Sequence, residues 1–200
     1  MSFRYAALML CVVCVIVFLI QNSVQGFTES LLLTKDVLSR PWILVTSIFL
    51  HGSMSHLLGN IFALGLFGSI LERLIGWRKF MAVFFVAGIV SGIASALFYD
   101  AALGASRAIF GALGMLAALR PKMMVWTYGV PMPMFIAAGF WFVLDIAGAF
   151  YPSSVANIAH IVGLAFGVAV GLIFRQSADE KRSKPLTDEE VGKWEDQWMK

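Results

Sequence analysis

Six long apolar stretches alternate with more polar segments along the chain. A helix needs about 20 apolar residues to cross the hydrocarbon core of a membrane. We therefore predict six transmembrane helices, at about 5–20, 55–71, 80–98, 106–119, 133–150 and 155–174, of which the fourth is short for a spanning helix. The first stretch is long for the apolar core of a signal peptide, and no small-residue cleavage site follows it. It is therefore counted as the first helix.

Two longer polar regions lie outside the six apolar stretches, one between the first and second and one after the sixth. The segment 21–53, between the first and second helices, is the first loop. Within it, the stretch from Trp42 to Leu50 is apolar but too short to span, which is typical of a re-entrant or interfacial segment. The last 25 or so residues are charged, so we divide the chain into a transmembrane domain (1–175) and a polar tail (176–200). The end of the tail, 186–200, is either a short amphipathic helix at the membrane surface or disordered.

Composition favours a membrane protein over a soluble one. Apolar residues make up 60% of the chain and charged residues 14%, against about 25% charged residues in typical soluble domains. The net charge of +3 gives no indication of nucleic-acid binding, so the lipid bilayer is the expected surrounding. Cys11 and Cys14 lie among leucine and valine in the first helix, where we expect packed or lipid-facing residues and no redox or zinc site.

The distribution of lysine and arginine predicts the orientation. With the N-terminus inside, the inner segments hold 12 of these 15 residues: Arg4, Arg73, Arg78, Lys79, Arg120, Lys122, Arg175, Lys181, Arg182, Lys184, Lys193 and Lys200. The outer segments hold Lys35, Arg40 and Arg107. Because cytoplasmic loops carry the excess of positive charge, we predict a multi-pass protein of the cell membrane with both termini in the cytoplasm.

Four polar residues within the apolar stretches are candidates for function, because such groups are costly inside a membrane. Ser106 begins the fourth helix, His160 lies in the sixth, and His56 and Asn60 share one face of the second. A serine next to a histidine is sufficient for covalent acyl transfer. Histidine and asparagine N–H groups, with backbone N–H groups at a helix N-terminus, are suitable donors to the oxyanion that forms.

Small residues on the fourth and sixth helices would allow these two helices to cross closely. The sixth helix carries Gly163, Gly167 and Gly171 at four-residue spacing, and the fourth offers Ala108, Gly111, Ala112 and Gly114. Phe110 follows Ser106 by four residues, so its ring is expected to stack on that of His160.

Structural roles for the same residues remain open from the pattern alone. An isolated serine in a membrane helix commonly bonds its own helix, and a histidine can form an interhelical bond or a proton relay. His56 and Asn60 could cap the second helix or bond the first loop, and His51 at the interface is expected to be structural. Asp145, in the fifth helix, is either a buried charge in a proton path or a residue near a polar partner.

Three motifs stand in order along the chain. The first comprises Arg40-Pro41-Trp42, Thr46-Ser47-Ile48-Phe49-Leu50-His51-Gly52-Ser53 and His56-Leu57-Leu58-Gly59-Asn60, with Leu71-Glu72-Arg73 and Gly76 after it. The second is Gly104-Ala105-Ser106, followed by Ala108-Ile109-Phe110-Gly111-Ala112-Leu113-Gly114, and the third is Ala159-His160-Ile161-Val162-Gly163 with Gly167. Together, over residues 5 to 175 or so, they resemble the rhomboid family of intramembrane serine proteases, in its prokaryotic type with a six-helix core.

The resemblance implies an all-α membrane protein: a bundle of six transmembrane helices with a half-inserted first loop and a water-filled cavity open to the outer face. It implies a serine endopeptidase that cleaves transmembrane protein substrates, with Ser106 as nucleophile and His160 as general base. His56 and Asn60 would stabilise the oxyanion, and Gly104 and Phe110 would support the site. No third acidic member, metal or cofactor is expected. The fifth helix, with Trp141 and Phe142, would lie near a lateral substrate gate.

One residue departs from the family pattern. The motif usually reads G-x-S-G, and here Arg107 follows the serine. The arginine could extend to the outer water, favour a developing oxyanion, fill the cavity or bind an acidic substrate group. Arg107 therefore leaves open an alternative function, that of a catalytically silent rhomboid-like protein that binds transmembrane helices. A third reading, a proton-coupled carrier using Asp145 and the histidines, is disfavoured because no inverted repeat is evident and acidic residues are absent from most helices.

Overall fold

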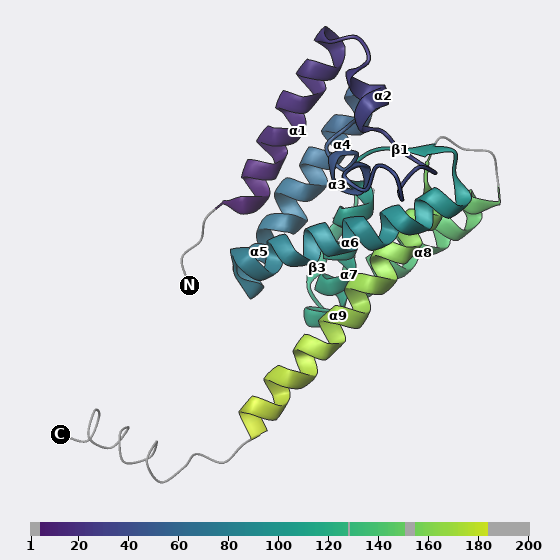
Figure 1. Cartoon of the computed structure of the whole chain (residues 1–200). Helices are drawn as coiled ribbons and strands as arrows, with labels where there is room; N and C mark the ends of the chain where they lie inside the picture. The colour runs from purple at the N-terminus through teal and green to yellow at the C-terminus, as the bar shows by residue number, and fades with distance from the viewer. Residues whose placement is uncertain (1–4, 128, 151–154, 184–200) are drawn as a thin grey trace.

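The computed structural model describes residues 5–127, 129–150 and 155–183, with side chains up to residue 176. The chain is mainly helical (Figure 1). Its elements are α1 (Ala6–Ser23), α2 (Phe27–Leu31), β1 (Leu33–Thr34), α3 (Ile43–Thr46), α4 (Met54–Ala63), the π-helical turn η1 (Leu64–Gly68), α5 (Ser69–Ile75), α6 (Trp77–Phe98), β2 (Ala101–Ala102), α7 (Ser106–Leu119), β3 (Met124–Thr127), β4 (Val130–Pro133), α8 (Met134–Ala149) and α9 (Asn157–Ser183).

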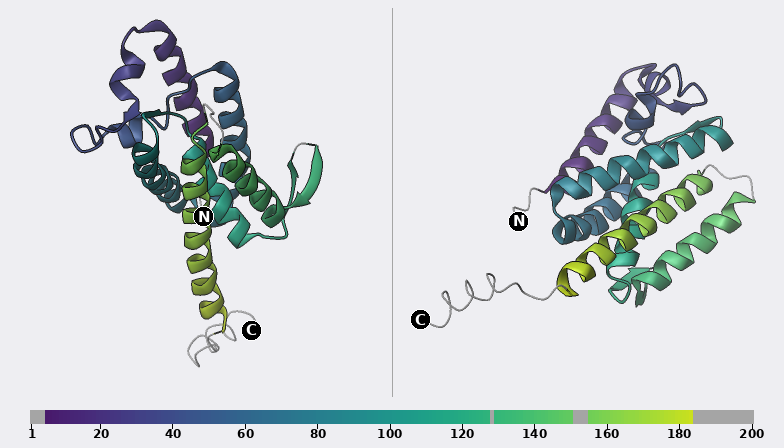
Figure 2. Two further views of the ribbon diagram at one scale, coloured as in Figure 1. Left: turned by 90° about the vertical axis from the view of Figure 1, so that its right-hand side faces the viewer. Right: turned by 60° about the horizontal axis from the view of Figure 1, so that its bottom comes forward.

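The six predicted helices are confirmed as α1, α4–α5, α6, α7, α8 and α9. Four of these are long and apolar enough to cross a membrane, namely Ala6–Ser23, Met54–Ile75, Trp77–Phe98 and Asn157–Gln176, and α7 and α8 are shorter apolar helices. Together they form an all-α bundle of the predicted class. The start of α1 and the end of α9 face the same side of it (Figures 1 and 2), as an even number of crossings requires.

The sixth helix is longer than predicted. It was expected to end near Phe174, but α9 continues to Ser183 and projects beyond the other helices (Figure 1). Residues 175–183 contain neither glycine nor proline and are mostly good helix formers, so nothing local stops the helix where the apolar stretch ends. The rest of the predicted polar tail, including 186–200, lies outside the described residues.

Two short strand pairs, which the hydrophobic pattern did not predict, occupy the connections. β1 pairs with β2 and joins the first loop to the segment that precedes α7. β3 and β4 form a hairpin between α7 and α8 that projects from the bundle (Figure 2, left). The first pairing matters for function, because it brings the first loop beside the start of α7.

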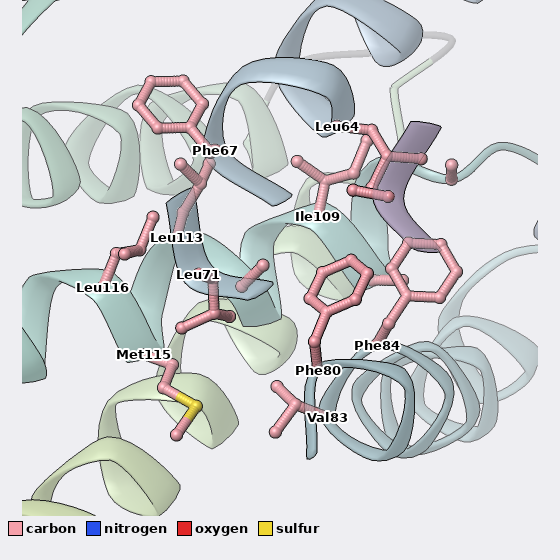
Figure 3. Close-up of a cluster of buried hydrophobic side chains, with 14 of the residues drawn as sticks. Leu64, Phe67, Leu71, Phe80, Val83, Phe84, Ile109, Leu113, Met115 and Leu116 are labelled. Carbon is pink, nitrogen blue, oxygen red and sulfur yellow. The ribbon is translucent and has the colours of Figure 1, made fainter. Parts of the chain in front are cut away.

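The centre of the bundle is α7. Eleven of its 14 residues are buried, from Arg107 to Ala118, because short apolar side chains on every face allow helices to pack all around it. In the core beside it, Leu64, Phe67 and Leu71 meet Phe80, Val83 and Phe84 of α6 and Ile109, Leu113, Met115 and Leu116 of α7 (Figure 3).

The predicted close crossing of the fourth and sixth helices is confirmed between α7 and α9. A Cβ added at Gly163 would overlap the carbonyl oxygen of Arg107, and one at Gly167 would overlap that of Gly111. In the other direction, a Cβ at Gly114 would overlap the carbonyl oxygen of Leu164. The two backbones are therefore in direct contact, and this contact fixes the spacing between side chains on the two helices.

The first helix is fastened to the bundle at both of its ends. The carboxylate of Glu72, only 1% exposed, accepts hydrogen bonds from the backbone N–H groups of Ala6 (3.0 Å) and Ala7 (2.9 Å). At the other end, the Gln21 side chain accepts from the N–H of His51 (3.0 Å) and donates to its carbonyl oxygen (3.4 Å). Glu72 thus satisfies free N–H groups at the positive end of α1.

Candidate active site

The segment before α7 places Ser106 at the first residue of the helix. Gly104 adopts a φ of +115°, which side chains rarely allow, and its N–H donates to the carbonyl oxygen of Ser47 in the first loop (2.9 Å). A Cβ at Gly104 would lie 2.7 Å from the ring of His56. Glycine is therefore required here twice, by its backbone angle and by the close approach of His56.

His160, on α9, reaches Ser106 across the contact between the two helices. Its Nε2 lies 2.7 Å from the hydroxyl oxygen of Ser106. The ring of Phe110 stacks on the imidazole as predicted, with 4.3 Å between centroids and 7° between planes. Stacking on one face and hydrogen bonding in the ring plane together hold the imidazole in one orientation.

A carboxylate lies on the other side of the imidazole, contrary to the expectation that no third acidic member would be present. The Nδ1 atom of His160 is 3.0 Å from Oδ1 of Asp145 on α8, and both side chains are about nine-tenths buried. Because a neutral imidazole carries one proton, donation from Nδ1 to this carboxylate leaves the lone pair of Nε2 facing Ser106.

The ring of His56 lies beside Gly104, two residues before Ser106, and the capping of the second helix that the sequence left open for His56 and Asn60 is performed by Ser53. The N–H of His56 donates to the Ser53 hydroxyl at the N-cap of α4 (3.1 Å). The Asn60 amide nitrogen donates to the carbonyl oxygen of His56 (3.0 Å). An amide nitrogen has two N–H groups, so one remains for another acceptor.

His51 is held in the first loop by main-chain and side-chain bonds. It is 2% exposed, its Nδ1 lies 3.1 Å from the carbonyl oxygen of Phe49, and its ring meets that of His56 edge to face at 5.1 Å. Burial, with a smaller effect of His56, lowers the pKa of His51 to about 4, so this ring is neutral at physiological pH. Its position supports the structural role expected from the sequence.

Arg107 does not extend to the outer water, which corrects one of its predicted positions. The residue is 2% exposed. Its Nε donates to the carbonyl oxygen of Gly88 on α6 (3.1 Å), and one terminal nitrogen donates to the carbonyl oxygen of Leu44 (3.3 Å) and the hydroxyl of Ser47 (2.7 Å). The guanidinium remains buried because three oxygens from two elements satisfy it. It points away from the Ser106–His160 pair and fastens the first loop to α6.

Trp141 and Phe142 lie on α8, four and three residues before Asp145. Trp141 packs edge to face on Phe67, with 5.9 Å between ring centroids. Phe142 lines an apolar groove of about 630 Å³ between α7, α8 and α9. Their assignment to a substrate gate stays a prediction.

A second hollow, of about 640 Å³, lies next to the first loop. It is lined by Phe18, Leu19, Gln21, Asn22, Thr28, His51, Gly52, Ser53, Met54 and Leu103. Leu103 directly precedes Gly104, so this hollow adjoins the segment that leads to Ser106. Within the described part of the chain, no group of three or more His, Cys, Asp or Glu side chains is arranged to hold a metal ion.

Comparison with known proteins places this geometry in a family. The model of the Rhomboid domain matches residues 38–177 of this chain, which is more than half of it. The chain belongs to the rhomboid family. The match includes the first loop from residue 38 onward, the second helix, Ser106, Asp145 and His160, whereas α1 lies before it.

This chain matches several named rhomboid relatives, each over part of its length. It is 37% identical over 131 residues to the rhomboid protease GluP of Bacillus subtilis, covering 63% of this chain and 24% of that protein. It is 33% identical over 135 residues to the mitochondrial RHOMBOID-like protein 6 of Arabidopsis thaliana, covering 66% and 43%. It is 28% identical over 178 residues to the mitochondrial Rhomboid protein 1 of Saccharomyces cerevisiae, covering 82% and 50%. The chain therefore spans half or less of the length of these rhomboid relatives.

Sequence reasoning on rhomboid motifs did not anticipate the contact between Asp145 and His160. One signal was available, since Asp145 is the only acidic residue in the apolar stretch 133–150. A single carboxylate inside a membrane helix requires a partner, and the histidines were the available candidates. Which histidine Asp145 contacts depends on how α8 packs against α9, and the hydrophobic periodicity of the sequence does not predict that packing.

Proposed function

We propose that this rhomboid is an intramembrane serine endopeptidase that cleaves transmembrane-helix substrates, with Ser106 as nucleophile and His160 as general base. The observation that carries the proposal is the 2.7 Å separation of the Ser106 hydroxyl from Nε2 of His160. Membership of a family that includes a named protease supports the reaction class. The protein would lie in the cell membrane with both termini in the cytoplasm, and its partners would be membrane-embedded proteins and lipid.

The proposed reaction follows from the positions of the polar atoms. Nε2 of His160 takes the hydroxyl proton as the Ser106 oxygen attacks a peptide carbonyl, forming a tetrahedral oxyanion. His160 then gives this proton to the departing amine, leaving an acyl ester on Ser106. A water molecule, deprotonated by the same imidazole, hydrolyses the ester and restores the free serine.

The oxyanion would be stabilised at the N-terminus of α7. Backbone N–H groups in the first turn of a helix have no intrahelical acceptor, and the helix dipole places partial positive charge there. The His56 ring, which lies beside Gly104, and the second N–H of the Asn60 amide, both on α4, would be further donors to the oxyanion. Donors of this kind, held in place before the reaction, commonly contribute about 10²–10³-fold to the rate each.

The alternative of a silent helix-binding protein was motivated by Arg107. That side chain is bonded to Gly88, Leu44 and Ser47 and does not occupy the space between Ser106 and His160. Nothing in its position opposes attack by the serine. We therefore retain the endopeptidase as the proposed function.

The test is cleavage of a model transmembrane substrate by purified protein, together with labelling by a fluorophosphonate, which reacts with activated serines. Ser106→Ala and His160→Ala are each expected to abolish both signals. The matched control is Ser95→Ala, because the buried hydroxyl of Ser95 has no hydrogen-bond partner among the described residues and lies on α6. Absence of labelling and cleavage in well-folded wild-type protein, across several substrates, would refute the proposal.

A further inference from the structure

Asp145 is the one feature of the site that the proposed serine–histidine pair does not require. It lies on α8, a helix whose other residues are apolar or glycine. Its side chain is about nine-tenths buried, and its Oδ1 is 3.0 Å from Nδ1 of His160. The hydroxyl of Ser106 lies at the opposite ring nitrogen. A carboxylate, an imidazole and a serine hydroxyl are therefore arranged in one line across α8, α9 and α7.

This carboxylate carries a cost that an apolar residue would avoid. Moving an ionised carboxylate out of water is unfavourable unless a partner satisfies it, and neutral packing is often as stable as a buried ion pair. Leucine or methionine would fill the same place on a helix that is apolar elsewhere. The contact with His160 is therefore better explained by what it does to the imidazole than by what it adds to the stability of the bundle.

The contact acts on the imidazole in two ways. By accepting a hydrogen bond from Nδ1, the carboxylate selects the tautomer whose Nε2 is unprotonated and can accept the Ser106 proton. Once that proton has moved, the imidazole is a cation in apolar surroundings. The carboxylate at 3.0 Å then pairs with it, which stabilises the charge that develops during attack.

We propose that Asp145 is a positioning residue that acts through His160, so that the site works as a serine–histidine–aspartate triad rather than the two-residue site expected from the family resemblance. This inference rests on the proposed endopeptidase function. Asp145 touches neither substrate nor Ser106. The proton travels only between the serine, Nε2 of His160 and the leaving amine.

The kinetic test compares Asp145→Asn and Asp145→Glu with wild type on a model transmembrane substrate. For Asp145→Asn, kcat is expected to fall by at least about tenfold with KM unchanged within about twofold, because general-base function is impaired while substrate binding is not. Asp145→Glu retains a carboxylate and is expected to recover part of kcat. Glu72→Gln is the matched control, since it removes another buried carboxylate at the start of α1 and should leave kcat unchanged.

A second measurement needs no variant at Asp145 and stands even where Asp145→Asn fails to fold. The ring nitrogens of ¹⁵N-histidine-labelled protein report their protonation by NMR, and the signals of His160 are assigned by comparison with His160→Ala. The proposal predicts a proton on Nδ1 and none on Nε2 in the neutral ring. The opposite tautomer would overturn it.

The possible failures are distinguishable. Active wild-type protein with an unchanged kcat in Asp145→Asn would overturn the triad and leave the proposed function intact. A raised KM with unchanged kcat would show that Asp145 only orders the bundle, and would also overturn the triad. Wild-type protein whose Ser106 neither reacts with fluorophosphonate nor cleaves would refute the proposed function, and the triad with it.

Discussion

At the scale of single residues, the site depends on polar side chains that find hydrogen-bond partners inside an apolar bundle. Arg107 illustrates this most clearly, because its guanidinium bonds two carbonyl oxygens and one hydroxyl. The hydroxyl belongs to Ser47, whose carbonyl oxygen also accepts the N–H of Gly104. Arg107 and Gly104 thus hold the same residue of the first loop beside the start of α7.

Replacing Arg107 by glycine, the usual residue of the family motif, is therefore expected to impair this protein. The change removes the donors to Gly88, Leu44 and Ser47 and leaves a void among buried groups. Hydrogen bonds to charged groups contribute about 1.5–3 kcal/mol each, so the melting temperature should fall by several degrees and fluorophosphonate labelling should slow. Arg107→Lys is the comparison variant, because it keeps the positive charge while its single ammonium group cannot reproduce the planar set of hydrogen bonds that the guanidinium makes. Faster labelling in Arg107→Gly would contradict this assignment.

Part of the site was predictable from the residues themselves, and part was not. Ser106, His160, His56 and Asn60 were found because polar residues stand out in apolar stretches, and the stacking of Phe110 followed from its four-residue spacing. Their catalytic roles stay predictions. The direction of Arg107 and the partner of Asp145 were missed because each depends on oxygens or nitrogens supplied by other helices, whose relative rotation no local pattern encodes.

At the scale of elements, the pair α7 and α9 sets the distance between Ser106 and His160. The six helices could be predicted because their apolar stretches are long, and their close crossing because glycines recur at four-residue spacing. The extension of α9 to Ser183 could not be predicted, because hydropathy marks the end of the apolar stretch and not the end of the helix. The strand pair β1–β2 is too short for a sequence pattern to indicate it.

Gly167→Ala should separate the two helices. Its Cβ would overlap the backbone of Gly111, which has no side chain to move aside, so α9 must shift away from α7. A displacement of about 1 Å in a catalytic geometry can cost about 100-fold in rate. We therefore expect labelling of Ser106 to fall by about that factor. The control is Gly139→Ala on α8, where a Cβ meets no atom within 4 Å. Equal labelling of the two variants would show that the contact does not set the site geometry.

At the scale of the whole molecule, α1 precedes the region that matches the family model and is fastened to that region. The Rhomboid match begins at residue 38, after α1 and α2. Glu72 holds the start of α1, and Gln21 holds its end against His51. The same first loop is bonded to Arg107 and Gly104, so the Gln21 end of α1 is connected to the candidate site, whereas Glu72 holds the opposite end of the helix.

Glu72→Gln is expected to loosen α1 without touching the site. A glutamine presents one N–H₂ group where the carboxylate accepts two backbone N–H groups, so about 1–3 kcal/mol of hydrogen bonding to a charged acceptor is lost. The expected result is a lower melting temperature and faster hydrogen exchange at the amides of Ala6 and Ala7. Glu72→Asp keeps the charge on a shorter side chain. Its melting temperature and its amide exchange rates should lie between those of wild type and those of Glu72→Gln. An unchanged exchange rate at these amides would contradict the assigned role of Glu72.

The direct contact between the backbones of α7 and α9 also bears on how such a protein can diverge. Natural variants with any side chain at Gly114, Gly163 or Gly167 would have to change the facing helix in the same step, and single substitutions rarely achieve that. Gly59 and Gly139, which face open space, carry no such restriction. Substitutions should therefore accumulate on the outward faces of α4 and α8, so that the outer surface of the bundle changes while the distance from Ser106 to His160 is inherited unchanged.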